Sequence, residues 1–499
     1  MRFHFWAPII LSAVGQAGVA TAAPSGDYAV SFSEQLYGEA RVEARFEGPV
    51  RSVSMAGWGA SQFPRGWGQF VRNLRASNCA GTAVELAEVA DKAEWTLARP
   101  VNRLCLSYRV DLSFTRSPWP FGAEQAGAFA DNTLYLVSKA LFIGPEDAEA
   151  IRVRFNAPGG YSAISPFPID TRNPGRHLVP TTMVLRQSSL VVSARPPIRA
   201  SSANFDFLLV LVGDKARDRA EVERVVHGVV PIYAGMFPSA VRRRYLMTIM
   251  SAASPDAEAF LDSAALTDPL PFSPAALPAW GNEIAHEIFH AWNAGFGGTD
   301  PETSQWFSEG VTEYFANRSL LRAGLVTPEQ FWSKAASEIG FYRLFLYSPA
   351  FDGMSVHQAG TNKGKYRLGV YNGGWAVAFA LDRLIHEHTN GASDLDDVMI
   401  ALQARRGANP RPIGLPEIVA AVKCVTGDNV WDDFFNRHVI GVEPLPLDTI
   451  AARLGFELRV SAHDGRAWLL PGASGAEANR RAFEHPSSAR ARMRTNCAV

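Results

Sequence analysis

The sequence predicts an α+β protein in which a β-rich N-terminal domain precedes a mainly helical domain. Up to about residue 195, apolar side chains alternate with polar ones and Gly- or Pro-rich breaks recur, as expected of strands joined by turns. From about residue 203, after two short apolar segments, apolar residues recur at helical spacing over long stretches. The 499 residues, 47% of them hydrophobic, are enough for two or more domains with substantial cores.

The first residues, MRFHFWAPIILSAVGQAGVATAAPSG, have the three parts of a secretory signal peptide. Arg2 supplies the positive start, Trp6–Val19 is mostly apolar, and Ala20–Ala22 has the A-x-A form of a cleavage site. The apolar run is interrupted and falls short of the ~20 residues that a membrane span needs. We therefore expect residues 1–22 to be removed. The mature protein is then periplasmic or extracellular, without an integral membrane segment.

Strand periodicity is clearest in two stretches of the predicted N-terminal domain, residues 23–195. CLSYRVDLSF, residues 105–114, alternates apolar and polar side chains throughout, and EARVEARFEG, residues 39–48, does the same. SARPPIRASS, residues 193–202, is then a predicted linker between the domains.

The second domain, residues 203–445, is predicted to open with a strand, a helix and another strand. Its long helices are predicted over residues 279–294, 304–323, 327–340 and 371–389. Residues 446–499 are predicted to form a partly ordered C-terminal extension whose polar, Arg-rich tail is poorly ordered.

The cysteines and the charge limit the classes of partner. Sequence proximity favours the disulfides Cys79–Cys105 and Cys424–Cys497, which an oxidising compartment would allow. The formal net charge of -1 provides no overall attraction to nucleic acid. The oligomeric state is not indicated by the sequence.

The candidate site begins in HEIFH, residues 286–290. Residues four apart share one face of a helix, so His286 and His290 can present two imidazoles to one metal ion. Glu287 follows the first histidine, and its carboxylate can reach a water on the metal without taking a coordination position. This pattern predicts a zinc site with Glu287 as the general base. Two core histidines without a metal are the structural alternative.

A second segment, WFSEGVTEYFA, supplies the missing ligand. Glu309 follows His290 after residues 291–308, which leave room for a helix end marked by Gly295, a loop and a second helix. Catalytic zinc takes three protein ligands and keeps one position open. Glu313 lies one turn further along the same face, where it can accept the other ring N–H of a ligand histidine.

These motifs resemble those of the gluzincin metallopeptidases, and HEIFHAWN is similar to the zinc motif of the M61 glycyl aminopeptidase family among them. The resemblance implies a thermolysin-like catalytic domain that holds one zinc ion per chain. Within the family motif, Trp292 and Asn293 are then structural, packing the site and holding the end of the zinc helix. The resemblance to the family extends to YNGGWAVAFALDRLIHEHTNGASDLDDVMIAL, which begins at Tyr371. It implies that Tyr371, or alternatively the preceding Tyr366, would stabilise the oxyanion.

Two features depart from that family. Family members have a Gly-rich strand whose glutamate holds the substrate amine. In this sequence AEAFLDSAAL stands in its place, and Asp262 and Glu258 are the candidate carboxylates for binding the amine. Too few residues follow GFELRV for the PDZ domain that often ends family members, so none is expected.

The predicted activity is hydrolysis of peptide or protein substrates, as an aminopeptidase that favours small N-terminal residues. An endopeptidase or a non-peptide zinc hydrolase at the same site is one alternative. An inactive, peptidase-like binding protein is the other. Two histidines and a glutamate are a usual zinc set, although the sequence does not exclude manganese or cobalt.

Overall fold

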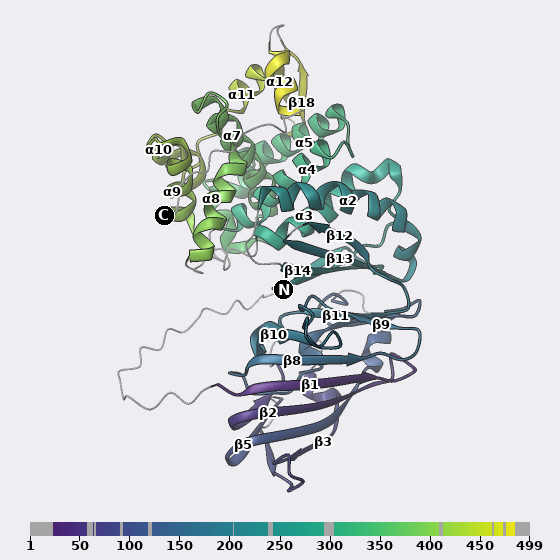
Figure 1. Ribbon diagram of the computed structural model, residues 1–499. Coiled ribbons are helices and arrows are strands. Elements are labelled where there is room, and N and C mark those ends of the chain that lie inside the picture. The colour runs from purple at the N-terminus through teal and green to yellow at the C-terminus, as the bar shows by residue number, and fades with distance from the viewer. Residues whose placement is uncertain are drawn as a thin grey trace, which may run out of the picture.

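The computed structural model describes residues 23–56, 63, 66–89, 93–117, 122–202, 204–237, 243–293, 304–408, 413–461, 464–472 and 476–484. The predicted signal peptide, Gly295 and Cys497 lie outside these residues. Sheets occupy one end of the molecule and helices the other, with a third sheet between them (Figure 1). The expected order, a β-rich domain followed by a mainly helical one, is confirmed. None of the helices in the described part combines the length and the apolar character of a membrane span.

A seven-stranded sheet forms the far end of the β-rich domain. Its order is β10-β8-β1-β2-β5-β3, and β4 also pairs with β5. The strands are β1 (Ser25–Phe32), β2 (Glu39–Ser54), β3 (Val71–Ser77), β4 (Leu86–Val89), β5 (Glu94–Asp111), β8 (Glu149–Asn156) and β10 (His177–Thr181). Every pair is antiparallel except β1 with β8. The predicted alternation is present, since Val42, Ala44 and Phe46 are buried between exposed neighbours.

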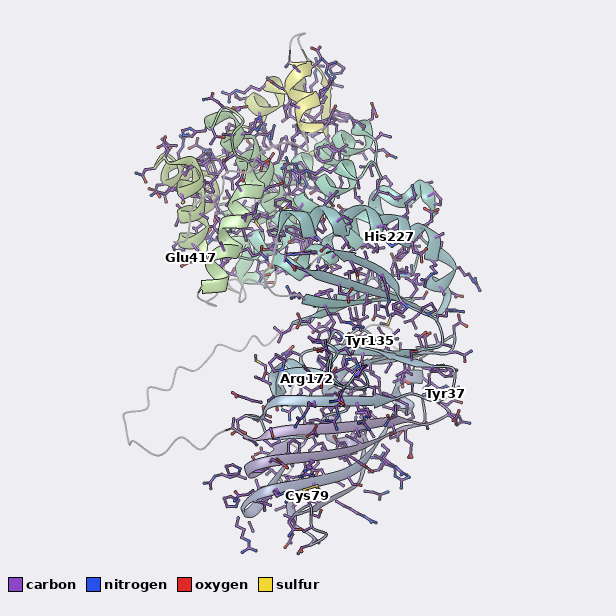
Figure 2. All side chains as sticks on the ribbon, viewed as in Figure 1. Tyr37, Cys79, Tyr135, Arg172, His227 and Glu417 are labelled. Carbon is purple, nitrogen blue, oxygen red and sulfur yellow. A yellow bond between two sulfur atoms is a disulfide. The ribbon has the colours of Figure 1, made fainter. Side chains whose placement is uncertain are left out.

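Two details of this sheet bear on the sequence predictions. The strand expected over residues 105–114 ends at Asp111, and the chain then turns through a 3-10 helix, Ser113–Arg116, that buries Phe114. The predicted Cys79–Cys105 disulfide is present and joins the chain after β3 to β5. Figure 2 places Cys79 at the end of the molecule remote from the helices. The second expected disulfide involves Cys497, which is outside the described residues.

A four-stranded sheet covers the first one, in the order β6-β7-β11-β9. Its strands are β6 (Gly127–Ala130), β7 (Thr133–Val137), β9 (Ser162–Ile164) and β11 (Ser189–Ser193). Every residue of β7 and β11 is buried, so these strands are covered on both faces. Tyr135 of β7 lies at the junction with the next layer (Figure 2).

The five-stranded sheet between the two ends has the order β12-β13-β14-β16-β15. Its strands are β12 (Ile198–Ser202), β13 (Phe205–Val212), β14 (Arg243–Met250), β15 (Asp256–Ala259) and β16 (Ser263–Thr267). Successive side chains of β13 enter different cores: Phe207 and Leu209 pack with the helices, whereas Leu208 and Val210 pack with the β-rich domain. The predicted linker was therefore wrong in its second half, because β12 is an edge strand of this shared sheet.

Helices cover the other face of the shared sheet. The helices of this domain are α2 (Arg219–Met236), α3 (Leu277–Asn293), α4 (Thr312–Arg322), α5 (Pro328–Tyr347), α7 (Gly374–His388), α8 (Leu395–Ala408), α9 (Leu415–Thr426), α10 (Trp431–Phe435) and α11 (Leu447–Arg453), with the short α6 (Val356–Ala359). The short α1 (Thr182–Arg186) instead packs against β10 in the β-rich domain. A capping box between Thr327 and Gln330 starts α5, which runs seven residues beyond the predicted end at residue 340.

The tail is more ordered than the sequence predicted. A hairpin of β17 (Phe456–Val460) and β18 (Ala467–Pro471) packs on α5, and α12 (Glu477–Glu484) follows it. The indole N–H of Trp332 donates to Glu484 at 2.6 Å, and the Trp332 ring lies 5.3 Å from the Phe483 ring. The prediction of a poorly ordered tail was therefore wrong as far as Glu484. The described part of this extension contains no PDZ domain.

Candidate metal centre

The two histidines of α3 and the glutamate of the next helix converge as predicted. His286 Nε2 lies 3.1 Å from His290 Nε2 and 3.3 Å from Glu309 Oε2, and His290 Nε2 lies 3.7 Å from Glu309 Oε2. Donors placed tetrahedrally at about 2.0–2.1 Å from one zinc ion are separated by roughly 3.3 Å, so this spacing suits a single ion. Within the described residues, this is the one group of histidine and acidic side chains that could hold a metal.

Hydrogen bonding also points to a cation between these donors. His286 Nδ1 lies 3.1 Å from Glu313 Oε2, and in the neutral ring this bond places the proton on Nδ1 and leaves a lone pair on Nε2 for a metal. That lone pair faces both His290 and the Glu309 carboxylate inside a buried site. Burial lowers the pKa of His286, but hydrogen bonds to Glu309 and Glu313 outweigh it and raise the pKa to about 10. The surroundings therefore favour a positive charge at Nε2, which a metal ion supplies.

Glu309 reaches the histidines from an unusual stretch of backbone. The helix predicted over residues 304–323 begins with a π-helical turn, η6 (Trp306–Val311), before α4. A second π-helical turn, η9 (Leu368–Gly373), precedes α7 and carries Tyr371. The two cross so closely that a Cβ on Gly310 would collide with the backbone of Gly374. This contact fixes Glu309 relative to Tyr371.

Asn293 ties the end of α3 to η6. Its amide donates to the carbonyl of Ser308 at 3.1 Å and to Thr312 Oγ1 at 2.7 Å. Asn293 is buried, and Trp292 packs 4.3 Å from the Phe205 ring beneath it. Both residues are therefore placed as structural supports of the metal-binding helices.

Glu313 belongs to a buried chain of polar contacts behind His286. Its other carboxylate oxygen accepts from Asn282 at 2.7 Å and lies 3.3 Å from Lys334 Nζ. Lys334 also contacts Glu338 at 2.6 Å, and Glu338 accepts from Asn372, the neighbour of Tyr371, at 2.5 Å. Burial raises the pKa of Glu313, but its bond with His286 and the charge of Lys334 outweigh this and lower the pKa to about 2. Glu313 is therefore a fixed carboxylate that orients the ring of His286.

Of the two candidate tyrosines, Tyr371 lies at the site. Its ring stacks 6.2 Å from that of His286. Burial and the charge of Glu309 raise the pKa of Tyr371, so its hydroxyl stays protonated and able to donate. Tyr366 instead packs 6.2 Å from Phe351, and no contact joins it to the metal donors within the described residues.

Glu287 and the two candidate amine-binding carboxylates have different surroundings. Glu287 is half-buried on α3, and it has no hydrogen bond or ion pair with other described residues. Asp262 pairs with Arg243 at 2.9 Å, and Arg243 in turn donates to the carbonyl of Ala291 on α3. Glu258 lies on the edge strand β15, where burial raises its pKa and the charge of Lys139, from the β-rich domain, acts on it. The structure therefore gives Asp262 and Glu258 cationic neighbours within the protein.

One functional residue was missed by the sequence analysis. Lys363 Nζ lies 2.6 Å from Glu309 Oε1 and 5.4 Å from the centre of the Tyr371 ring. It lies outside both motifs, so no spacing rule connected it to Glu309. The only sequence signal was the basic run Lys363, Lys365 and Arg367 just before Tyr371.

The shared sheet and the convergent metal donors define a metallopeptidase of the gluzincin class. Family models match two parts of this chain. Residues 27–179 match the Peptidase M61 N-terminal domain, and residues 281–363 match M61 glycyl aminopeptidase. The resemblance to the M61 family is thus confirmed, and the enzyme is an aminopeptidase-type metallopeptidase.

A solved structure agrees with the fold. An aminopeptidase N family protein from Idiomarina loihiensis has a TM-score of 0.68 at 16% identity, and the match covers 87% of this chain and 79% of that one. An M1 zinc metallopeptidase from Deinococcus radiodurans has a TM-score of 0.46 at 16% identity, covering 88% and 98%. At 16% identity, the similarity to the Idiomarina loihiensis protein concerns the fold alone. No curated protein matches the sequence.

Proposed function

We propose that this protein is a zinc-dependent peptidase in which His286, His290 and Glu309 hold one zinc ion. The convergence of their three donor atoms, with spacings of 3.1–3.7 Å, carries the proposal. Two imidazoles and a carboxylate are a usual donor set for catalytic zinc, and they leave one position open. Peptide hydrolysis is supported by the M61 match over the same residues.

The chain's own residues then divide the chemistry between them. When bound, zinc polarises the scissile carbonyl and makes water more acidic. Glu287 takes the proton of the attacking water and passes it to the leaving amine. Because this role needs an unpaired carboxylate, its lack of an ion-pair partner among the described residues is consistent with it. The Tyr371 hydroxyl donates to the carbonyl oxygen as negative charge develops there.

We propose aminopeptidase action on small N-terminal residues as the first specificity. The description of the matching family, glycyl aminopeptidase, supports it. Such an enzyme needs a carboxylate for the substrate's free amine, and Asp262 or Glu258 would have to provide it. Either carboxylate would have to give up part of its interaction with Arg243 or Lys139.

That requirement favours a second candidate function, an endopeptidase at the same site. An endopeptidase holds no free amine, so it places no demand on Asp262 or Glu258. The ion pair between Asp262 and Arg243 is then a structural link between the shared sheet and α3.

Export to the periplasm or the cell exterior is also proposed. It rests on the signal-peptide pattern of residues 1–22. The Cys79–Cys105 disulfide supports it, because such bonds persist in oxidising compartments.

The test is cleavage mapping by mass spectrometry on a peptide pool that contains free and N-acetylated copies of each sequence. Stepwise loss of N-terminal residues from the free copies alone would support an aminopeptidase. Internal cuts in both copies would establish an endopeptidase. Zinc in the protein without any cleavage would contradict the peptidase proposal. It would leave a non-peptide hydrolase or a peptidase-like binding protein.

A further inference from the structure

A basic segment adjoins the candidate metal centre. Between Asp352 and Asp382 the sequence contains no acidic residue, whereas Lys363, Lys365 and Arg367 lie within five positions. This segment precedes η9, the turn that carries Tyr371. The basic residues are therefore held near the proposed reaction centre by the chain itself.

Two of the three cations lie against Tyr371. The Arg367 guanidinium carbon is 4.6 Å from the centre of the Tyr371 ring, and Lys363 Nζ is 5.4 Å from it. The third cation, Lys365, lies 4.9 Å from the ring of Tyr366 instead. Since the Tyr371 ring stacks on that of His286, Lys363 and Arg367 border the metal donors.

Among the described residues, these two charges share one carboxylate partner. Lys363 pairs with Glu309, whose other oxygen faces His286 and His290. Within the described residues, no carboxylate pairs with Arg367, which is exposed. The Lys363 side chain is 38% exposed, so solvent or a ligand can reach it. A carboxylate arriving beside Tyr371 would meet two cations, and among the described residues the one carboxylate already paired with either of them is Glu309.

We propose that Lys363 and Arg367 bind a carboxylate of the substrate, so that the enzyme prefers peptides with a carboxylate near the scissile bond. This inference rests on the proposed peptidase function and specifies its substrate class. The guanidinium of Arg367 offers a fork of donors that matches a carboxylate, and the Lys363 ammonium adds a point charge. The carboxylate can come from an acidic side chain or from the free C-terminus of a short peptide.

The experiment compares three peptides that differ only in the carboxylate. They are Ala-Gln-Ala amide, Ala-Glu-Ala amide, and Ala-Gln-Ala with a free C-terminus. The Glu peptide tests a side-chain carboxylate and the free acid tests the terminal one. We expect kcat/KM to be about tenfold or more higher for at least one of the two than for the neutral amide, as hydrogen bonds between charged groups allow. Equal kcat/KM for all three peptides would overturn the inference while leaving the peptidase function intact.

Variants assign the preference to these residues. Arg367→Gln should reduce the preference at least severalfold, and Arg367→Lys should restore part of it. Lys365→Gln is the matched control, because it removes the same charge from the same segment but beside Tyr366. A preference that survives in Arg367→Gln, or is lost equally in Lys365→Gln, would contradict the assignment. No turnover of these three peptides, together with no cleavage in the peptide pool, by the zinc-loaded protein would refute the proposed function, and this inference with it.

Discussion

Two groups of candidate carboxylates differ in how they are partnered. On the side formed by α3 and η6, Glu309 faces the two histidines and Glu313 holds the outer nitrogen of His286. On the shared sheet, Asp262 before β16 pairs with Arg243, and Glu258 of β15 lies near Lys139 of the β-rich domain. In the first arrangement three donor atoms converge where one metal ion fits, whereas in the second the carboxylates have cationic side chains nearby and no such convergence is seen among the described residues. The comparison teaches that the hydrolytic centre is better defined than the site for a substrate amine.

The largest expected effect comes from removing a metal donor. His290→Ala should abolish both bound zinc and peptide turnover, because two remaining donors hold zinc poorly. Metal analysis and an activity assay on the same sample check this. His227→Ala is the control: His227 lies on α2 and bonds to the Arg199 carbonyl (Figure 2). Full zinc content in His290→Ala would mean that the metal binds elsewhere.

The next largest effect is expected from Tyr371, which is proposed to stabilise the oxyanion. Tyr371→Phe should lower kcat by about 10²–10³-fold with a smaller change in KM, since the lost hydroxyl acts mainly in the transition state. Steady-state kinetics measure both constants. Tyr366→Phe is the matched control and should remain near wild type. If Tyr366→Phe lost more activity than Tyr371→Phe, oxyanion stabilisation would have to be assigned to Tyr366 instead.

A smaller effect is expected from Glu313, which bonds to His286 on the side away from the proposed zinc ion. Glu313→Gln should weaken zinc affinity by about 10–100-fold, because the ring of His286 would lose its charged acceptor. Competition with a zinc chelator measures the affinity. An unchanged affinity would show that Glu313 serves only the buried contacts with Asn282 and Lys334.

The smallest effect tests the other side of the comparison. If Asp262 has only its structural role, Asp262→Asn should leave the ratio of turnover between free and N-acetylated peptides unchanged. The variant should lose some stability, since Arg243 would lose its carboxylate partner. A ratio that falls toward one would instead give Asp262 the amine-binding role and favour the aminopeptidase.

Periodicity was enough to predict the main elements. The spacing of HEIFH and the later WFSEG placed His286, His290 and Glu309 on two helices, which bring them together. The order of a β-rich domain before a helical one followed from the change of period near residue 203. These features depend on the spacing of residues close together in the chain, so they can be predicted from one sequence.

Long-range packing explains what the sequence did not predict. The crossing of η6 with the start of α7 brings Gly310 against Gly374, residues 64 positions apart that no local pattern relates. Similarly, the tail is ordered because Trp332 of α5 bonds to Glu484. Lys363 meets Glu309 across 54 positions, outside any spacing rule.

The most direct test of the central claim measures zinc content and peptide turnover together, in the wild type and in Glu287→Gln. We expect one zinc ion per chain in both proteins and turnover in the wild type, with kcat lower by about 10²–10⁴-fold in the variant. That outcome would separate metal binding from proton transfer, as the geometry requires. A wild type without zinc, or a Glu287→Gln variant with full activity, would contradict the account.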